Sequence, residues 1–199
     1  MSRLHSSHGW DHVERVVALA AKIAATEKKA DPFIIQVAAL LHDIARIDEV
    51  DSTGIQCHAE RGSSIAYEFL LQCGLEEKRA HHIRNCILSH RYRNEHVPDT
   101  IEAKVLYDAD KLDSIGAVGI GRAFLFSGEV GARLHNPDID VSLAEAYGKE
   151  DTAYREYIVK LRHVSDKMLT DEGKRIAHER HRFMVDFFNR LQDEVKGLS

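Results

Sequence analysis

The chain has 199 residues, enough for one sizeable hydrophobic core, and 44% of them are apolar and 30% charged. The formal net charge of −5 argues against general nucleic-acid binding through bulk charge, and no apolar run approaches the roughly 20 residues that span a bilayer. The N-terminus lacks the apolar segment of a signal peptide, and the three cysteines are widely spaced. We therefore expect a cytoplasmic protein with reduced thiols and no thiolate zinc site.

Helical periodicity dominates the first part of the chain. A first helix is predicted from about Gly9 to Lys29, with an apolar stripe on one face. Asp31 followed by Pro32 is a typical helix start. The helix that it opens, Pro32 to about Ile47, is apolar almost all round, so we expect it in the centre of the fold.

The rest of the chain also predicts helices, joined by polar segments. After a polar loop at 48–56, we expect a helix from about His58 to Cys73 that ends at Gly74, a helix from Glu76 to about Ser89 and a basic loop at 90–98. A helix over 101–112 follows, capped by Asp99 or Thr100, and then a glycine-rich helical segment at 116–121 whose small residues allow close backbone approach. The last predicted elements are an irregular excursion at 128–140 and helices over about 152–169 and 171–195. The predicted fold class is all-α, without an internal repeat or a linker that would split the chain.

The pair His42-Asp43 lies in the apolar segment Ala39–Ile44. Burying an imidazole and a carboxylate together is costly unless both are satisfied. A hydrogen-bonded buried pair is one solution, and a metal ion bound by a neutral imidazole and an ionised carboxylate is another. Because neighbouring residues on a helix point about 100° apart, such a pair can reach one ion or two neighbouring ions.

Two further helices place residues of the same chemical type on apolar faces. His12 is in register with Val16 on its helix. Asp110 is in register with Ala103 and Leu106. Each alone is commonly a satisfied polar group of the core. Three helices that each direct a His or an Asp inward favour a shared partner such as a metal ion.

The order His12, His42-Asp43 and Asp110 resembles the pattern of the HD phosphohydrolase superfamily: a His, then a His-Asp pair, then a distant Asp. The sequences around these residues resemble the family as well, and they are Asp11–Val16, Leu40–Ile44 and Lys104–Asp113. The following segments, Ser114–Arg122 and Leu125–Gly128, are similar to the bacterial YedJ/YpgQ-like subgroup. The likeness covers residues 8–130 well and continues more loosely through the C-terminal helices.

The resemblance implies one HD-type domain over 1–199, with a helical core at about 8–130 and a C-terminal helical extension at about 140–199. It implies a divalent metal (Mn, Mg, Fe, Co, Ni or Zn) held by His12, His42, Asp43 and Asp110. The implied reaction is hydrolysis of a phosphate ester or anhydride, commonly of a nucleotide, by metal-activated water near Asp43. A cyclic- or dinucleotide phosphodiesterase with two metals and a catalytically silent metal- and nucleotide-binding regulator stay open as alternatives.

His58 and His90 resemble the additional histidines of dinuclear members, in which the HD aspartate bridges two ions. The alternative is a single-metal site in which these two histidines support the metal ligands or contact the substrate. Glu60 is a candidate proton donor or a group close to the metal, with a surface salt bridge as the alternative.

One position departs from the family pattern. Some nucleotide-cleaving members carry a catalytic Glu three residues after the HD aspartate, where this chain has Arg46, so that mechanism cannot be carried over. Arg15, Arg46 and Lys111 are candidates for offsetting negative charge in the transition state. Asp113 is a candidate for orienting a ligand histidine.

The remaining candidates are weaker. Arg91 and Arg93, on the loop after His90, and Lys160, from the C-terminal part, are candidate residues of the pocket. Solvated surface charges are the alternative for each. The apolar stripe of the last helix, formed by Ile176, Phe183, Met184, Phe187, Phe188 and Leu191, is expected in the core, and a homodimer face is the alternative.

Overall fold

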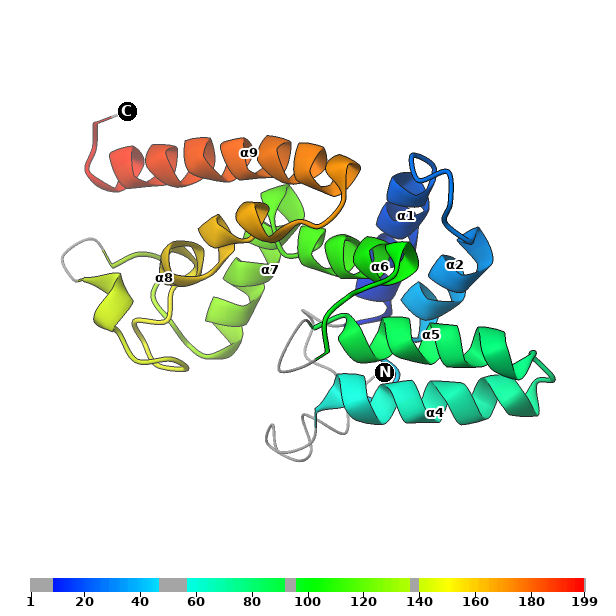
Figure 1. Ribbon diagram of the computed structural model, residues 1–199. Helices are drawn as coiled ribbons and strands as arrows, with labels where there is room; N and C mark the ends of the chain where they lie inside the picture. Colours follow the sequence, from blue (N-terminus) through cyan, green and yellow to red (C-terminus); the bar gives the residue numbers. More distant parts are fainter. Residues whose placement is uncertain (1–8, 47–56, 92–95, 137–139, 199) are drawn as a thin grey trace. The chain divides into compact units, whose positions relative to one another are not determined.

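A computed structural model describes residues 9–46, 57–91, 96–136 and 140–198. The predicted polar loop at 48–56 and Arg93 lie outside these ranges. The described residues form helices and no strand, which confirms the all-α fold class (Figure 1). The chain divides into two compact units, Met1–Asp110 and Lys111–Ser199. That the whole chain acts as one domain stays a prediction.

The first unit is a helical bundle. It contains α1 (Trp10–Ala24), α2 (Pro32–Leu41), α4 (His58–Gln72), α5 (Glu77–Ser89) and most of α6 (Ile101–Leu112). α1 packs against α2, α2 against α5, and α4 runs beside α5 (Figure 1). The core consists of fully buried side chains from these helices, among them Val16, Ile23, Ile35, Ile83, Ile87 and Leu106.

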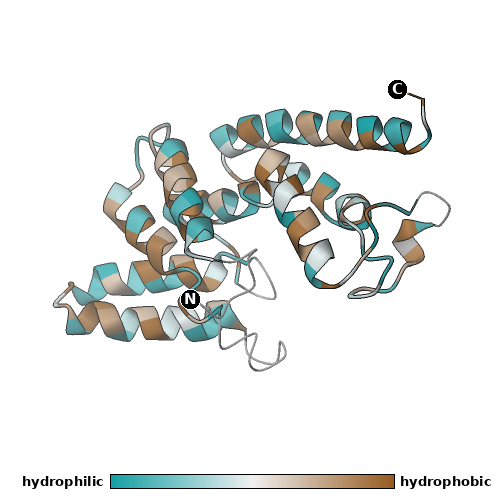
Figure 2. Cartoon of the chain, turned by 180° about the vertical axis from the view of Figure 1, so that it is seen from behind, coloured by the Kyte–Doolittle hydropathy of each residue, from teal (hydrophilic) through white to brown (hydrophobic). Residues whose placement is uncertain are grey.

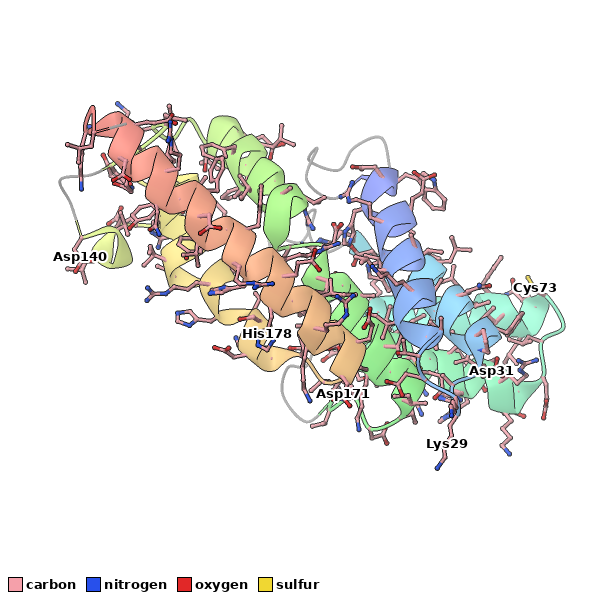
Figure 3. The ribbon with its side chains drawn as sticks, turned by 90° about the horizontal axis from the view of Figure 1, so that it is seen from above. Lys29, Asp31, Cys73, Asp140, Asp171 and His178 are labelled. Carbon is pink, nitrogen blue, oxygen red and sulfur yellow. The ribbon has the colours of Figure 1, made fainter. Side chains whose placement is uncertain are left out.

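Local chemistry explains where several of these helices begin and end. The carboxylate of Asp31, labelled at the start of α2 in Figure 3, accepts hydrogen bonds from the backbone N–H groups of Phe33 and Ile34. α4 ends as predicted, because Gly74 adopts a left-handed φ of 80° and lets the N–H of Leu75 reach the carbonyl of Leu70. α1 ends at Ala24, earlier than the predicted Lys29.

Two expectations about α2 are wrong. The helix ends at Leu41 instead of Ile47, and the next bonds span three residues, from Ile44 N–H to the Leu41 carbonyl and from Arg46 N–H to the Asp43 carbonyl. The helix is also only half buried, since Phe33 and Leu40 are 43% and 45% exposed. The His-Asp pair therefore lies in a tight turn at the helix end.

The second unit contains α7 (Gly116–Glu129), η2 (Val141–Leu143), α8 (Ala153–Val159), η3 (Leu161–His163), η4 (Ser165–Lys167) and α9 (Asp171–Val195). α7 packs against both α8 and α9. The helix predicted over 152–169 is broken after α8, where Lys160 leaves the helical conformation with φ −138°. The hydroxyl of Thr170 caps α9, and Figure 3 labels the first residue of this helix, Asp171.

The glycine-rich segment is helical, as predicted, and α7 continues beyond it to Glu129. Gly119 is the position where the backbone approaches most closely, because a Cβ atom there would lie 2.2 Å from the carbonyl oxygen of Ser114. The irregular excursion begins only after the end of α7.

Half of the residues that form the apolar stripe of α9 are buried in the core of the second unit. Ile176, Met184 and Phe188 are buried, and Phe188 stacks on Tyr157 with 4.4 Å between ring centroids. Hydrophilic and hydrophobic bands alternate along this helix in Figure 2. Phe183 is half exposed, and the dimer face stays a prediction. Among the described residues, no helix combines the length and the apolar character needed to cross a membrane.

Candidate metal centre

Three elements of the first unit bring their ligand-type side chains to one point. His12 lies on the buried face of α1, His42 directly follows α2, and Asp110 lies near the end of α6. The Nε2 atom of His12 is 3.3 Å from Nε2 of His42 and 3.5 Å from Oδ1 of Asp110. We call His12, His42 and Asp110 the first cluster.

A second cluster lies beside the first and consists of Asp43, His58 and His90. His58 is the first residue of α4, and His90 follows the last residue of α5. The Nε2 atoms of these two histidines are 3.2 Å apart, and all three side chains are buried.

Asp43 joins the two clusters. Its Oδ2 atom is 3.7 Å from Nε2 of His12 and 3.8 Å from Nε2 of His42. Its Oδ1 atom is 3.1 Å from Nε2 of His58 and 4.0 Å from Nε2 of His90. The two oxygens of one carboxylate therefore face different sets of histidines.

Backbone carbonyls orient two of the four histidines. Nδ1 of His42 donates to the carbonyl of Ala39 at 2.7 Å, and Nδ1 of His90 donates to the carbonyl of Ile87 at 2.6 Å. A carbonyl can only accept, so the hydrogen of each neutral ring is on Nδ1 and the Nε2 lone pair points into the cluster. Histidines that bind metals usually have this arrangement.

The electrostatics of the site favour a neutral His90 beside an ionised Asp43. Burial lowers the pKa of His90 to about 3, so its ring is neutral at physiological pH. Burial alone would raise the pKa of Asp43, but the neighbouring His42 and His58 outweigh it and hold this pKa well below its usual value. Neutral histidine nitrogens and carboxylate oxygens are the donors that a divalent cation requires.

The geometry of the first cluster fits one such cation. Donors about 2.1 Å from a common ion lie about 3.0–3.4 Å apart at octahedral to tetrahedral angles. Within the first cluster together with Oδ2 of Asp43, the four separations given above run from 3.3 to 3.8 Å. Small side-chain movements would therefore bring all four donors to one ion.

Two arginines lie against the second cluster. Nη1 of Arg46 is 2.9 Å from Nδ1 of His58, and Nη1 of Arg91 is 3.4 Å from the same atom. The sequence does not predict that Arg46 and Arg91 contact the same residue, because they are far apart in the chain. They meet at His58, the first residue of α4.

The other predicted residues have different surroundings. Arg15 forms an ion pair of 2.6 Å with Asp11, and Lys111 follows Asp110 on α6 and is partly buried. Catalytic roles for Arg15 and Lys111 stay predictions. Glu60 is 53% exposed, and its Oε1 atom is 3.9 Å from Nε2 of His96. These surroundings favour a surface salt bridge over a role as proton donor.

Two further candidates lie in the second unit and have ionic partners there. The buried Asp113 accepts a hydrogen bond of 2.7 Å from Arg122. The exposed Lys160 pairs with Glu156 on the last turn of α8. The orienting role predicted for Asp113 is filled at His42 and His90 by backbone carbonyls.

The chain is similar to known proteins along most of its length. The model of the HD domain family matches residues 9–115. The uncharacterised protein YpgQ of Bacillus subtilis is 36% identical over 197 residues, which covers 97% of this chain and 87% of YpgQ. The crystal structure of Bacillus subtilis YpgQ in complex with ADP superposes with a TM-score of 0.76 at 34% identity, covering 98% and 94% of the two chains. The crystal structure of an HD-superfamily hydrolase from Bacillus thuringiensis superposes with a TM-score of 0.75 at 29% identity. The match covers 98% of this chain and 90% of the hydrolase.

Proposed function

The chain belongs to the HD domain family and is a metal-dependent phosphohydrolase, and from this premise we propose that it hydrolyses a phosphate ester or anhydride of a nucleotide. The reaction takes place at His12, His42, Asp43 and Asp110. The observation that carries the proposal is the convergence of these four side chains from three separate segments onto one point. The ADP bound to the similar protein YpgQ supports a nucleotide substrate.

The metal is held in this proposal by Nε2 of His12 and His42, by Oδ2 of Asp43 and by the carboxylate of Asp110. A divalent ion bound there supplies a Lewis acid that acidifies water and polarises a phosphoryl oxygen. His42 contributes a lone pair that the carbonyl of Ala39 fixes in direction. The protein thus provides preformed donors, and little reorganisation is needed when an ion binds.

The surrounding residues orient the reactants and balance charge. Asp43 stays ionised and accepts a hydrogen bond from the water that attacks phosphorus, while His58 holds its other oxygen at 3.1 Å. Negative charge grows on the phosphoryl oxygens as the bond to the leaving group breaks. Arg15, Arg46 and Lys111 are the cations of this proposal that offset that charge.

A second candidate function is a cyclic- or dinucleotide phosphodiesterase with two metal ions. The observation that favours it is the second cluster, where Asp43, His58 and His90 offer three buried donor atoms next to the first. A silent regulator is disfavoured, because every donor of the first cluster is present and close to the others.

The test is a substrate panel with purified protein and Mn²⁺. It compares nucleoside mono-, di- and triphosphates, sugar phosphates and cyclic dinucleotides by the release of phosphate, pyrophosphate or linear dinucleotide. We expect turnover of nucleotides that Asp43→Asn abolishes and that Glu60→Gln, a change of an exposed carboxylate, leaves intact. Hydrolysis of sugar phosphates alone would refute the nucleotide substrate, and preference for cyclic dinucleotides would favour the second candidate.

A further inference from the structure

The C-terminal end of α6 is held by two arginines from other helices. Nη1 of Arg180, on α9, donates to the carbonyl of Leu112, the last residue of α6. Nη1 of Arg122, on α7, donates to the carbonyl of Asp113 at 3.2 Å and to its carboxylate at 2.7 Å. All four residues belong to the second unit. Two successive carbonyls at the end of one helix therefore accept hydrogen bonds from guanidinium groups.

These bonds add to the local ones that close the helix. The last four carbonyls of a helix have no partner within it, and helix ends fray unless other groups bond to them. After α6, the N–H and the hydroxyl of Ser114 donate to the carbonyl of Lys111 at 3.0 and 2.6 Å, and the N–H of Ile115 donates to that of Leu112 at 3.2 Å. The arginines contribute charged donors, which form stronger bonds and are favoured at the negative end of the helix dipole.

The packing around this turn is close. Gly116 has a φ of 77°, and a Cβ atom there would lie 2.9–3.1 Å from three carbon atoms of the Arg180 side chain. The glycine therefore leaves the space through which this side chain reaches Leu112. Asp113 and Arg122 are only 1% and 16% exposed, so their ion pair is largely shielded from water. A bond between charged groups in such surroundings holds the backbone more firmly than one at the surface.

Asp110 lies in the turn that these bonds hold. It is two residues before the carbonyl to which Arg180 donates, which is about 3 Å along the helix axis at a rise of about 1.5 Å per residue. Its Oδ1 atom is 3.5 Å from Nε2 of His12. If the last turn of α6 unwound, the backbone of Asp110 would move and its carboxylate would leave the first cluster.

We propose, building on the proposed function, that Arg180, together with Arg122, is a positioning residue for the metal centre: it holds the last turn of α6 and thereby the carboxylate of Asp110. Arg180 acts through the backbone of α6 and requires no contact with the ion or the substrate. The ligands His12 and His42 come from other segments and do not depend on this anchor. The second unit thus contributes to metal affinity without supplying a ligand.

The first experiment measures the Kd of the full chain for Mn²⁺ by electron paramagnetic resonance of the free ion. Arg180→Met keeps the aliphatic length of the side chain but removes the donor and the charge. We expect a Kd about 10-fold higher, since groups that support metal ligands contribute about 10–100-fold to affinity. Arg180→Lys, which keeps a donor and a charge, should recover most of the affinity. Arg182→Met, at an exposed position of the same helix, is the control and should bind as the wild type does.

The second experiment separates positioning from a general loss of stability. It measures backbone hydrogen exchange of the metal-free proteins by nuclear magnetic resonance. We expect faster exchange in Arg180→Met at residues 109–115 and unchanged exchange in α1 and α4. A folded Arg180→Met with the Mn²⁺ affinity of the wild type would overturn the proposal, and so would weaker binding accompanied by equally faster exchange in α1 and α4.

The metal-free wild type provides a test that does not depend on any variant folding. Its amides at 109–112 should exchange as slowly as those at 105–108, because the anchored turn does not fray. Much faster exchange at 109–112 would overturn the proposal. A wild type that binds no divalent ion would instead refute the proposed function, and with it the premise of this inference, whatever the exchange data show.

Discussion

Replacing Asp43 by Asn separates the metal-binding role of this side chain from its structural role. Asp43 is buried and lies between both clusters. The amide keeps an oxygen that accepts from His58 and gains an N–H₂ group that can donate to the lone pair of His42. A hydrogen bond to a neutral group contributes about 1 kcal/mol less than one to a charged group, so the metal-free variant should lose only about that much stability.

The loss of metal binding should be much larger. A ligand present at 100 times its Kd stabilises the folded state by about 2.7 kcal/mol. For a chain of this length that corresponds to a rise in Tm of about 5–11 °C. Mutating even a residue that only supports a ligand weakens metal binding about 10–100-fold. Removing a ligand should weaken metal binding by at least about 100-fold. At the same Mn²⁺ concentration the ion then stabilises the variant by only about 0.4 kcal/mol, and its Tm rises by about 1–2 °C.

The assay is thermal unfolding of both proteins in EDTA and in Mn²⁺ at 100 times the wild-type Kd, with circular dichroism to compare helix content. Glu60→Gln, which alters an exposed carboxylate, should keep the full rise in Tm and serves as the control. If Asp43→Asn showed the same Mn²⁺-dependent rise as the wild type, the assignment of this carboxylate to the metal centre would be wrong.

Three further predictions concern packing and thiol chemistry. Gly119→Ala should destabilise the protein by about 1–3 kcal/mol in urea unfolding, because its Cβ would meet a backbone carbonyl at 2.2 Å. Gly121→Ala, with open space around its Cβ, should stabilise it by about 0.5–1 kcal/mol. Phe188→Ala should cost about 3–5 kcal/mol in the same assay, since this buried ring stacks on Tyr157. Burial raises the pKa of Cys86 to about 12, so it stays a thiol at pH 8 and should react with a disulfide reagent only after unfolding.

Each of these has an outcome that would contradict it. Equal unfolding midpoints for the two glycine variants would contradict the close approach at Gly119. A loss below about 1 kcal/mol in Phe188→Ala would mean that the ring is not in the core, since burial of such a ring contributes more. Rapid modification of the folded protein, measured with Cys57→Ser and Cys73→Ser so that only Cys86 can react, would contradict its burial.

Helices with clear local signals could be predicted from the sequence. The bounds of α6 and α9 agree with the prediction, because Thr100 and Thr170 cap them and the apolar spacing is regular. The early end of α2 could not be predicted, because it coincides with a tight turn in which the His42 ring bonds to the backbone of Ala39. The Nε2 atom of the same ring contacts His12 of α1, so its surroundings include a residue from another helix.

The residue pattern predicted the members of the first cluster, but not the interactions that orient them. Every residue has a carbonyl, so nothing in the sequence distinguishes the one of Ile87, which accepts from His90. The contact of Arg46 with His58 joins residues from two separate segments, and the sequence does not show which ring nitrogen the guanidinium reaches. Such information lies in the tertiary structure alone.

The most direct test of the account is a crystal structure of the protein grown with Mn²⁺, with the ion located from its anomalous scattering. The account predicts a peak bonded to Nε2 of His12 and His42 and to the carboxylates of Asp43 and Asp110. A bound ion elsewhere in the chain, with these four side chains in contact only with one another or with water, would contradict it.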